Sequence, residues 1–251
     1  MSENESRKLA VLIDGDNAQA SLCTELLAEV AKFGIASVKR AYGDWTTTHL
    51  RSWKEHLHKH AIQPVQQFSY TTGKNATDSA LIIDAMDLLH EGHLDGFCLV
   101  SSDSDFTRLA TRIRESGLTV YGFGEKKTPE PFVSACDKFV YTEILSGQST
   151  AKGKSRSKSK DESVNKALKH IITSAIDAVS KDDGWAPLAG VGNYINKNNP
   201  SFDPRNYGYE KLGRLVKSLS YIELREEKVS PGSSNVHLFI KTRSAESTSA
   251  T

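Results

Sequence analysis

Aspartates follow two apolar runs of the sequence, each of which is typical of a buried β-strand. Asp14 and Asp16 come after the first run, and Asp103 and Asp105 come after the second. In an open parallel sheet, ligands bind beyond the carboxyl ends of the strands, near the point where the strand order reverses. If the two strands are neighbours, these carboxylates converge at one edge of the sheet.

Carboxylates that lie close together repel one another and raise one another's pKa. A divalent cation relieves this repulsion, and Mg²⁺ or Mn²⁺ suits a set of carboxylates completed by water. The pattern therefore favours a metal centre. Each aspartate also has a second interpretation, because Asp after a strand is a preferred N-cap of the next helix. We expect Asp103 or Asp105 to cap the helix that starts near Phe106, and Asp78 could cap its own helix.

The elements that must position these residues alternate between strands and helices. We expect strands at 9–13, 37–45, 62–68, 96–100, 118–123 and 139–141, and helices at 18–33, 46–60, 77–91, 106–116 and 131–137. Such βαβ units predict an α/β fold with a mainly parallel sheet, and the two most apolar strands, 9–13 and 96–100, should be central. The helix at 77–91 is apolar on nearly every side, which predicts deep burial.

Charge divides the chain into three segments. Residues 1–146 carry a net charge of −5, residues 147–160 carry +5 with no acidic residue, and residues 161–251 carry +1. The middle segment has no apolar residue larger than alanine, so we expect a basic flexible linker over 147–162. Because residues 1–146 are acidic overall, any attraction for a nucleic acid would come from the linker and from local patches.

The C-terminal part, residues 163–243, is predicted to be a second domain. We expect helices at 163–180, 188–196 and 207–219, and strands at 222–226 and 236–240 that flank a hairpin loop at 230–235. Three helices and a β-hairpin describe a winged helix-turn-helix, a small α+β domain. The polar tail, residues 244–251, is expected to be disordered.

Composition excludes several classes of protein. The chain is 38% hydrophobic and 25% charged, and no apolar run approaches the roughly 18 residues of a membrane span. The first residues contain no apolar signal-peptide segment. The three cysteines are far apart, which favours free thiols in a reducing compartment. We therefore expect a cytoplasmic protein without a membrane partner, and the sequence permits homo-oligomers without defining their number.

A second group of side chains that could bind a metal lies in the run Lys-Glu-His-Leu-His-Lys-His. His56 and His60 are four residues apart, which puts both on one helical face, and such a pair can bind zinc. No cysteine or other third ligand stands nearby in the sequence. We interpret this segment as a solvated helix face.

Four short motifs resemble those of the NYN domains of the PIN-like nuclease superfamily. They are Leu-Ile-Asp-Gly-Asp-Asn-Ala, Lys-Asn-Ala-Thr-Asp-Ser-Ala-Leu-Ile-Ile-Asp-Ala-Met-Asp, Leu-Val-Ser-Ser-Asp-Ser-Asp-Phe and Val-Tyr-Gly-Phe-Gly, in the family's order over about residues 8–145. The resemblance implies a Rossmann-like sheet and metal-dependent cleavage of RNA. The catalytic and Mg²⁺- or Mn²⁺-binding residues that it implies are Asp14, Asp78, Asp103 and Asp105.

The same resemblance gives other residues supporting roles. Asn17 and Ser101 match positions of the family beside the acidic residues, and we include Asp16 with them. Lys74 stands in the loop before Asp78, where a lysine could reach a phosphate.

The second domain resembles the LOTUS (OST-HTH) domain. The motifs are Gly-Trp-Ala-Pro-Leu, Pro-Ser-Phe-Asp-Pro-Arg-Asn-Tyr-Gly-Tyr-Glu-Lys-Leu and Val-His-Leu-Phe-Ile. The resemblance implies a winged helix that binds RNA or a protein partner. We expect RNA contacts from Arg205 and from Lys211, Arg214 and Lys217, the last three spaced three apart on one predicted helix.

Three functions are consistent with the sequence. The first is a metal-dependent ribonuclease with a LOTUS module for RNA or partner recognition, and the second is an RNA-binding adaptor with little or no catalysis. The third is a haloacid-dehalogenase-type phosphatase, because Leu-Ile-Asp-Gly-Asp also resembles that family's nucleophile loop. In the phosphatase, Asp14 would be the nucleophile and Asp16 the acid/base.

Overall fold

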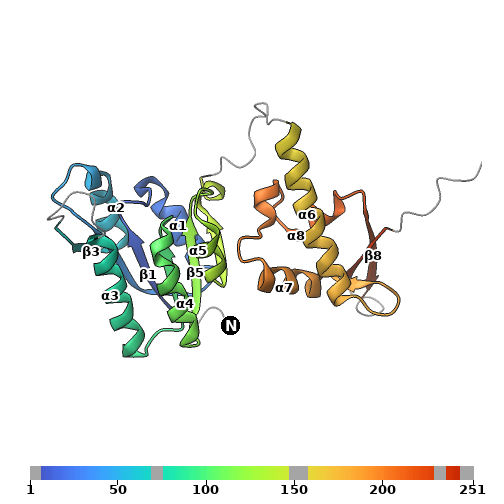
Figure 1. Ribbon diagram of the computed structural model, residues 1–251, viewed down its shortest axis with the longest axis horizontal. Coiled ribbons are helices and arrows are strands. Elements are labelled where there is room, and N and C mark those ends of the chain that lie inside the picture. The colour runs from blue at the N-terminus through green and yellow to red at the C-terminus, as the bar shows by residue number, and fades with distance from the viewer. Residues whose placement is uncertain (1–6, 69–75, 147–157, 229–235, 244–251) are drawn as a thin grey trace, which may run out of the picture. The chain divides into compact units, whose positions relative to one another are not determined.

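The computed structural model describes residues 7–68, 76–146, 158–228 and 236–243, and the chain divides into two compact units, residues 1–149 and 150–251 (Figure 1). Lys74, the predicted hairpin loop at 230–235 and the predicted tail lie outside the described residues, as does the predicted linker up to residue 157. Within the described ranges, no helix is long and apolar enough to cross a membrane.

The first unit contains a six-stranded sheet in which each strand pairs with its neighbours in parallel. Its strands are β1 (Lys8–Asp14), β2 (Ile35–Gly43), β3 (Gln63–Gln66), β4 (Gly96–Val100), β5 (Thr119–Gly124) and β6 (Lys138–Tyr141). The order β3-β2-β1-β4-β5-β6 places β1 and β4 side by side at the centre, as predicted. Ile13 pairs with Val100, so the two strands reach the same edge of the sheet together.

Helices cover both faces of this sheet (Figure 1). They are α1 (Cys23–Val30), α2 (Trp53–His60), α3 (Ala76–Glu91), α4 (Thr107–Glu115) and α5 (Glu130–Ala135). Successive side chains of a strand point to opposite faces. Leu9, Val11 and Ile13 of β1 pack in the core beneath α1 and α2, while Ala10 and Leu12 pack in the core beneath α3, α4 and α5.

The helix α3 is less buried than its composition predicts. Leu81, Ala85 and Leu88 are buried at helical spacing, whereas 63% of Ile83 is exposed. The prediction of deep burial on all sides was wrong because α3 covers only one face of the sheet, so its opposite side has no partner within the described residues of this unit. Periodicity counts the apolar side chains and does not show which elements pack against them.

The second unit combines three helices with a small sheet. The helices are α6 (Lys158–Val179), α7 (Leu188–Asn198) and α8 (Leu212–Lys217), and the strands are β7 (Ala186–Pro187), β8 (Ile222–Lys228) and β9 (Val236–Thr242). The strand order is β7-β9-β8, and both pairings are antiparallel. Ile172 and Ile176 of α6, Val191 of α7 and Val216 of α8 share one buried core with Ile240 of β9. This is the small α+β architecture expected from the sequence.

Two helix boundaries of this unit differ from those predicted. The helix α6 starts at Lys158, within the segment assigned to the linker. Its first six residues are all polar, so no apolar periodicity marks a helix there in the sequence. The helix α8 starts at Leu212 rather than near Tyr207. Gly208 has a left-handed backbone with φ of 85°, which ends a short 3₁₀ helix, Pro204–Tyr207, before α8 begins.

Candidate metal centre

Asp14 is the last residue of β1 and is fully buried. Its Oδ2 atom accepts hydrogen bonds from Ser101 Oγ and Asn17 Nδ2, both at 2.7 Å, and its Oδ1 atom accepts one from the backbone N–H of Asn17 at 3.3 Å. Burial raises the pKa of Asp14, while the hydrogen bonds from Ser101 and Asn17 favour its charged form. Asp14 is thus a buried carboxylate held by two of the three residues predicted to support the site, Ser101 and Asn17.

Three of the other predicted acids lie together. Asp78 is in the first turn of α3, and Asp103 and Asp105 follow β4. One carboxylate oxygen from each lies within 4.8 Å of the others. Burial and then the negative charges of Asp14, Asp103, Asp105 and Asp16 raise the pKa of Asp78 to about 6. The mutual repulsion expected from the sequence is therefore present in the fold.

The loop after β4 is ordered by side-chain hydrogen bonds. Asp103 caps the 3₁₀ turn Ser104–Phe106, because its Oδ1 atom accepts from the backbone N–H of Asp105 at 3.0 Å. The backbone N–H of Asp103 donates to Ser101 Oγ at 3.1 Å. Asp103 was one of the two capping residues predicted. Capping leaves its carboxylate beside Asp78, so the two interpretations of this residue are compatible.

Asp16 lies in the turn after β1 and is held from α3. Thr77 is buried and its hydroxyl donates to Asp16 Oδ2 at 3.1 Å. The turn passes so close to β2 that residue 15 has no room for a side chain: a Cβ atom on Gly15 would lie 2.8 Å from the carbonyl oxygen of Tyr42. Thr77 was not predicted as a site residue, although its position directly before Asp78 was a signal that could have identified it.

The chemistry of the donors fits a divalent cation. Asp78, Asp103 and Asp105 offer hard oxygen ligands at one point, and within the described ranges no lysine or arginine forms an ion pair with Asp78 or Asp103. Carboxylates of this kind suit Mg²⁺ or Mn²⁺. Asp14 is not one of the three clustered carboxylates. Its oxygens accept hydrogen bonds from Ser101 and Asn17, and its charge contributes to the high pKa of Asp78.

In the second unit, Arg205 has an intramolecular role. Its guanidinium binds the carboxylate of Asp203, with Nη2 2.6 Å from Oδ2, and Asp203 also caps the 3₁₀ helix that contains Arg205. This ion pair orders the turn before α8.

The three basic residues predicted on one helix are arranged differently. Lys211 is the residue before α8, so the prediction that all three share a helix was wrong. Arg214 pairs with Glu210 at 3.2 Å, and Lys217 pairs with Glu226 at 3.1 Å. Both pairs are exposed, and exposed ion pairs of this kind contribute little to stability and break readily.

Both parts of the chain match models of known protein families. A family model for the NYN domain matches residues 8–145. The chain belongs to the NYN domain family. A second model, for the OST-HTH/LOTUS domain, matches residues 159–232. NYN domains are part of the PIN-like nuclease superfamily, and LOTUS domains are associated with RNA binding. The family architecture is therefore the one that the motifs indicated.

Several solved structures are similar to parts of this NYN–LOTUS chain. A fragment, residues 175–257, of a Chromobacterium violaceum protein is 42% identical over 33% of this chain and 86% of its own, with a TM-score of 0.26. An uncharacterized Nitrosomonas europaea protein is 30% identical over 41% and 88%, with a TM-score of 0.30. A Vibrio parahaemolyticus protein of unknown function is 19% identical over 56% and 96%, with a TM-score of 0.47. No curated protein matched the chain.

Proposed function

We propose that the NYN domain is a ribonuclease that requires Mg²⁺ or Mn²⁺ and cleaves RNA phosphodiester bonds. The observation that carries this proposal is the cluster of Asp78, Asp103 and Asp105 beyond the carboxyl ends of two central parallel strands. This is the place where α/β folds bind ligands. Membership of the PIN-like nuclease superfamily makes a phosphodiester the expected substrate.

The acidic residues would hold the cation and orient what it binds. Asp78, Asp103 and Asp105 would supply ligand oxygens, with Asp14 as the buried acid behind them. When bound, a divalent cation makes a water molecule more acidic and stabilises charge on a phosphate and its leaving oxygen. Ser101 would keep Asp14 and the Asp103 loop in register through its two hydrogen bonds.

The LOTUS domain would supply recognition. Its family's association with RNA supports an RNA substrate over DNA, and a protein partner is the alternative ligand. We propose that Lys211, Arg214 and Lys217 contact phosphates. On binding, RNA would replace Glu210 as the partner of Arg214 and Glu226 as the partner of Lys217. The basic segment 147–160 would raise the local concentration of RNA without sequence preference.

The phosphatase mechanism is not favoured by the environment of Asp14. A nucleophilic aspartate must present a carboxylate oxygen to its substrate, whereas Asp14 is fully buried and both of its oxygens accept hydrogen bonds. Burial also raises its pKa, which disfavours the charged nucleophile.

End-labelled RNA and DNA incubated with the full chain in Mn²⁺, in Mg²⁺ and in EDTA test the proposal. We expect RNA cleavage in the presence of a metal, none in EDTA, and weaker or no cleavage of DNA. RNA binding without turnover in either metal would instead show that the protein is an adaptor. Hydrolysis of a small phosphomonoester would support the phosphatase.

A further inference from the structure

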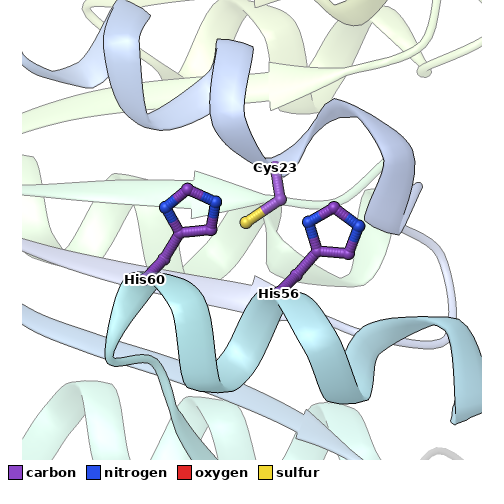
Figure 2. Close-up of side chains that lie close together, drawn as sticks. All are labelled: Cys23, His56 and His60. Carbon is purple, nitrogen blue, oxygen red and sulfur yellow. The ribbon is translucent and has the colours of Figure 1, made fainter.

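Side chains that commonly bind transition metals meet between α1 and α2. Cys23 begins α1, and His56 and His60 lie four residues apart on α2. One ligand atom from each of the three residues lies within 4.8 Å of the others. Figure 2 shows the Cys23 sulfur between the two imidazole rings, with each ring turning a nitrogen-bearing edge toward it. The fold thus provides the third ligand that the sequence around the histidines lacks.

One buried ring nitrogen at this place has no hydrogen-bond partner among the described residues that would explain its burial. Nδ1 of His56 is buried and has no hydrogen-bond partner within the described part of the chain. Buried polar atoms nearly always have a partner, so an orphaned imidazole nitrogen that faces a thiol calls for a ligand. The rings of His56 and His60 are nearly parallel, at 8°, with centroids 6.2 Å apart, and the Cys23 sulfur lies between them (Figure 2).

The surroundings hold the histidines in place. Lys39 donates to the carbonyl oxygen of His60. Nε2 of His60 lies 3.1 Å from the hydroxyl of Thr24, the residue after Cys23, and an ion bound to Nε2 would replace this contact. Trp53 and Leu57, on the buried side of α2, pack in the same core as Cys23. The three ligand residues are therefore positioned by two helices that are already packed, as a metal site requires.

A reactive thiol is the other role that a conspicuous cysteine could have. Only 1% of Cys23 is exposed, and burial raises the pKa of its thiol to about 11. A thiol that is buried and protonated at neutral pH is a poor nucleophile. Coordination to a metal does not need an exposed thiolate.

We propose that Cys23, His56 and His60 bind a Zn²⁺ ion that fastens α1 to α2, with a water molecule as the fourth ligand. Zinc is bound in proteins by thiolate and imidazole in four-coordinate sites, and three protein ligands with one water is a common arrangement. The acidic cluster offers oxygen ligands only, so the two sites would select different metals. This site does not depend on the proposed ribonuclease activity.

Cobalt substitution of the metal-free, full-length protein tests the zinc site. Co²⁺ bound by a thiolate gives a sulfur-to-metal charge-transfer absorption that carboxylate ligands do not give. We expect one such Co²⁺ per chain, displaced by Zn²⁺. The absorption should be lost in Cys23→Ser, and the affinity should fall by more than about tenfold in His56→Gln and His60→Gln. His58→Gln is the matched control, since His58 is exposed on the same helix, and it should bind as the wild type does.

Thermal unfolding gives a second readout. At a zinc concentration about 100 times the dissociation constant, the melting temperature of the wild type should rise by about 5–10 °C, and that of Cys23→Ser should not. Asp103→Asn should keep the absorption, because the acidic cluster is a separate site. A folded wild type without thiolate absorption, or absorption that persists in Cys23→Ser, would overturn the proposal. If Cys23→Ser does not fold, unchanged cobalt affinity in both histidine variants would overturn it equally.

Discussion

The hydroxyl of Ser101 lies 2.7 Å from Oδ2 of Asp14 and donates a hydrogen bond to it, between the ends of the neighbouring strands β1 and β4. The same hydroxyl accepts a hydrogen bond from the backbone N–H of Asp103. One side chain therefore joins the buried carboxylate of the first strand to the loop that carries two of the clustered acids.

Ser101→Ala should weaken metal binding without removing any carboxylate. Asp14 would lose one of its two side-chain donors, and the backbone N–H of Asp103 would lose its acceptor. We therefore expect Mn²⁺ affinity to fall by about 10- to 100-fold, as it does when outer-shell partners are removed. Isothermal titration with Mn²⁺ measures this effect. Ser102→Ala is the control, because the Ser102 hydroxyl accepts from the backbone N–H of Glu125 and not from the acidic loop. Equal affinity in wild type and Ser101→Ala would contradict the role of Ser101.

Asp78→Asn should stabilise the metal-free protein at neutral pH. The pKa of Asp78 is raised from 3.8 to about 6 in the fold, so the native state binds its proton more tightly than the unfolded state does. The charged form therefore destabilises the fold above about pH 6, and this penalty disappears as the pH falls toward about 4.

We expect Asp78→Asn to melt at a higher temperature than the wild type in EDTA at about pH 7.5, and the difference to shrink at about pH 4.5. Excess Mn²⁺ should reverse the order at the higher pH by stabilising only the wild type. A variant that is less stable than the wild type in EDTA at the higher pH would be incompatible with the repulsion.

Asp84→Ala should destabilise the first unit more than Asp87→Ala does. Asp84 on α3 pairs with Arg40 and accepts the hydroxyl hydrogen bond of Tyr42, which is fully buried. The substitution leaves the buried Tyr42 hydroxyl without an acceptor, and this should lower the free energy of unfolding by about 1–3 kcal/mol. Asp87 is exposed on the same helix, so its replacement should change that energy by less than about 0.5 kcal/mol. Urea unfolding compares the two, and equal losses would argue against the Tyr42 interaction.

Ala61→Gly should stabilise the protein. Ala61 is the C-cap of α2 and has a left-handed backbone with φ of 49°, which disfavours any residue with a Cβ atom. Glycine removes that penalty but adds entropy to the unfolded chain, so we expect a net gain of about 0.5–1 kcal/mol in thermal or urea unfolding. Ala31 is the C-cap of α1 and has φ of −59°, so Ala31→Gly should instead lower the free energy of unfolding by about 0.5–1 kcal/mol. A loss in both variants would contradict this reading of Ala61.

The sequence predicted the features that depend on neighbouring residues and on the order of elements. Apolar runs separated by helices permit few arrangements other than a parallel sheet, and this is why β1 and β4 could be expected at its centre. The cap formed by Asp103 could be predicted because its partner, Asp105, is two residues away. The approach of Asp14 to Asp103 and Asp105 then depended only on where the strands end, whereas Asp78, in the first turn of α3, was included because of the family resemblance.

Contacts between distant segments could not be predicted in this way. Cys23 lies more than 30 residues from His56, and the two meet only because α1 packs beside α2 at a particular rotation. The hydrogen bond from Tyr42 to Asp84 likewise joins two distant segments, the strand β2 and the helix α3. A single sequence carries no direct signal of such rotations.

Cleavage of labelled RNA in Mn²⁺ by Asp103→Asn, beside Asp87→Asn as a control, tests the central claim most directly. Asparagine keeps an oxygen that can accept from the Asp105 N–H, so circular dichroism and melting in EDTA should show an intact fold. We expect the Asp103→Asn rate to fall by about 100-fold or more, because a positioned charge is lost, while Asp87→Asn cleaves as the wild type does. Undiminished, Mn²⁺-dependent cleavage by folded Asp103→Asn would contradict the assignment of the acidic cluster as the metal centre.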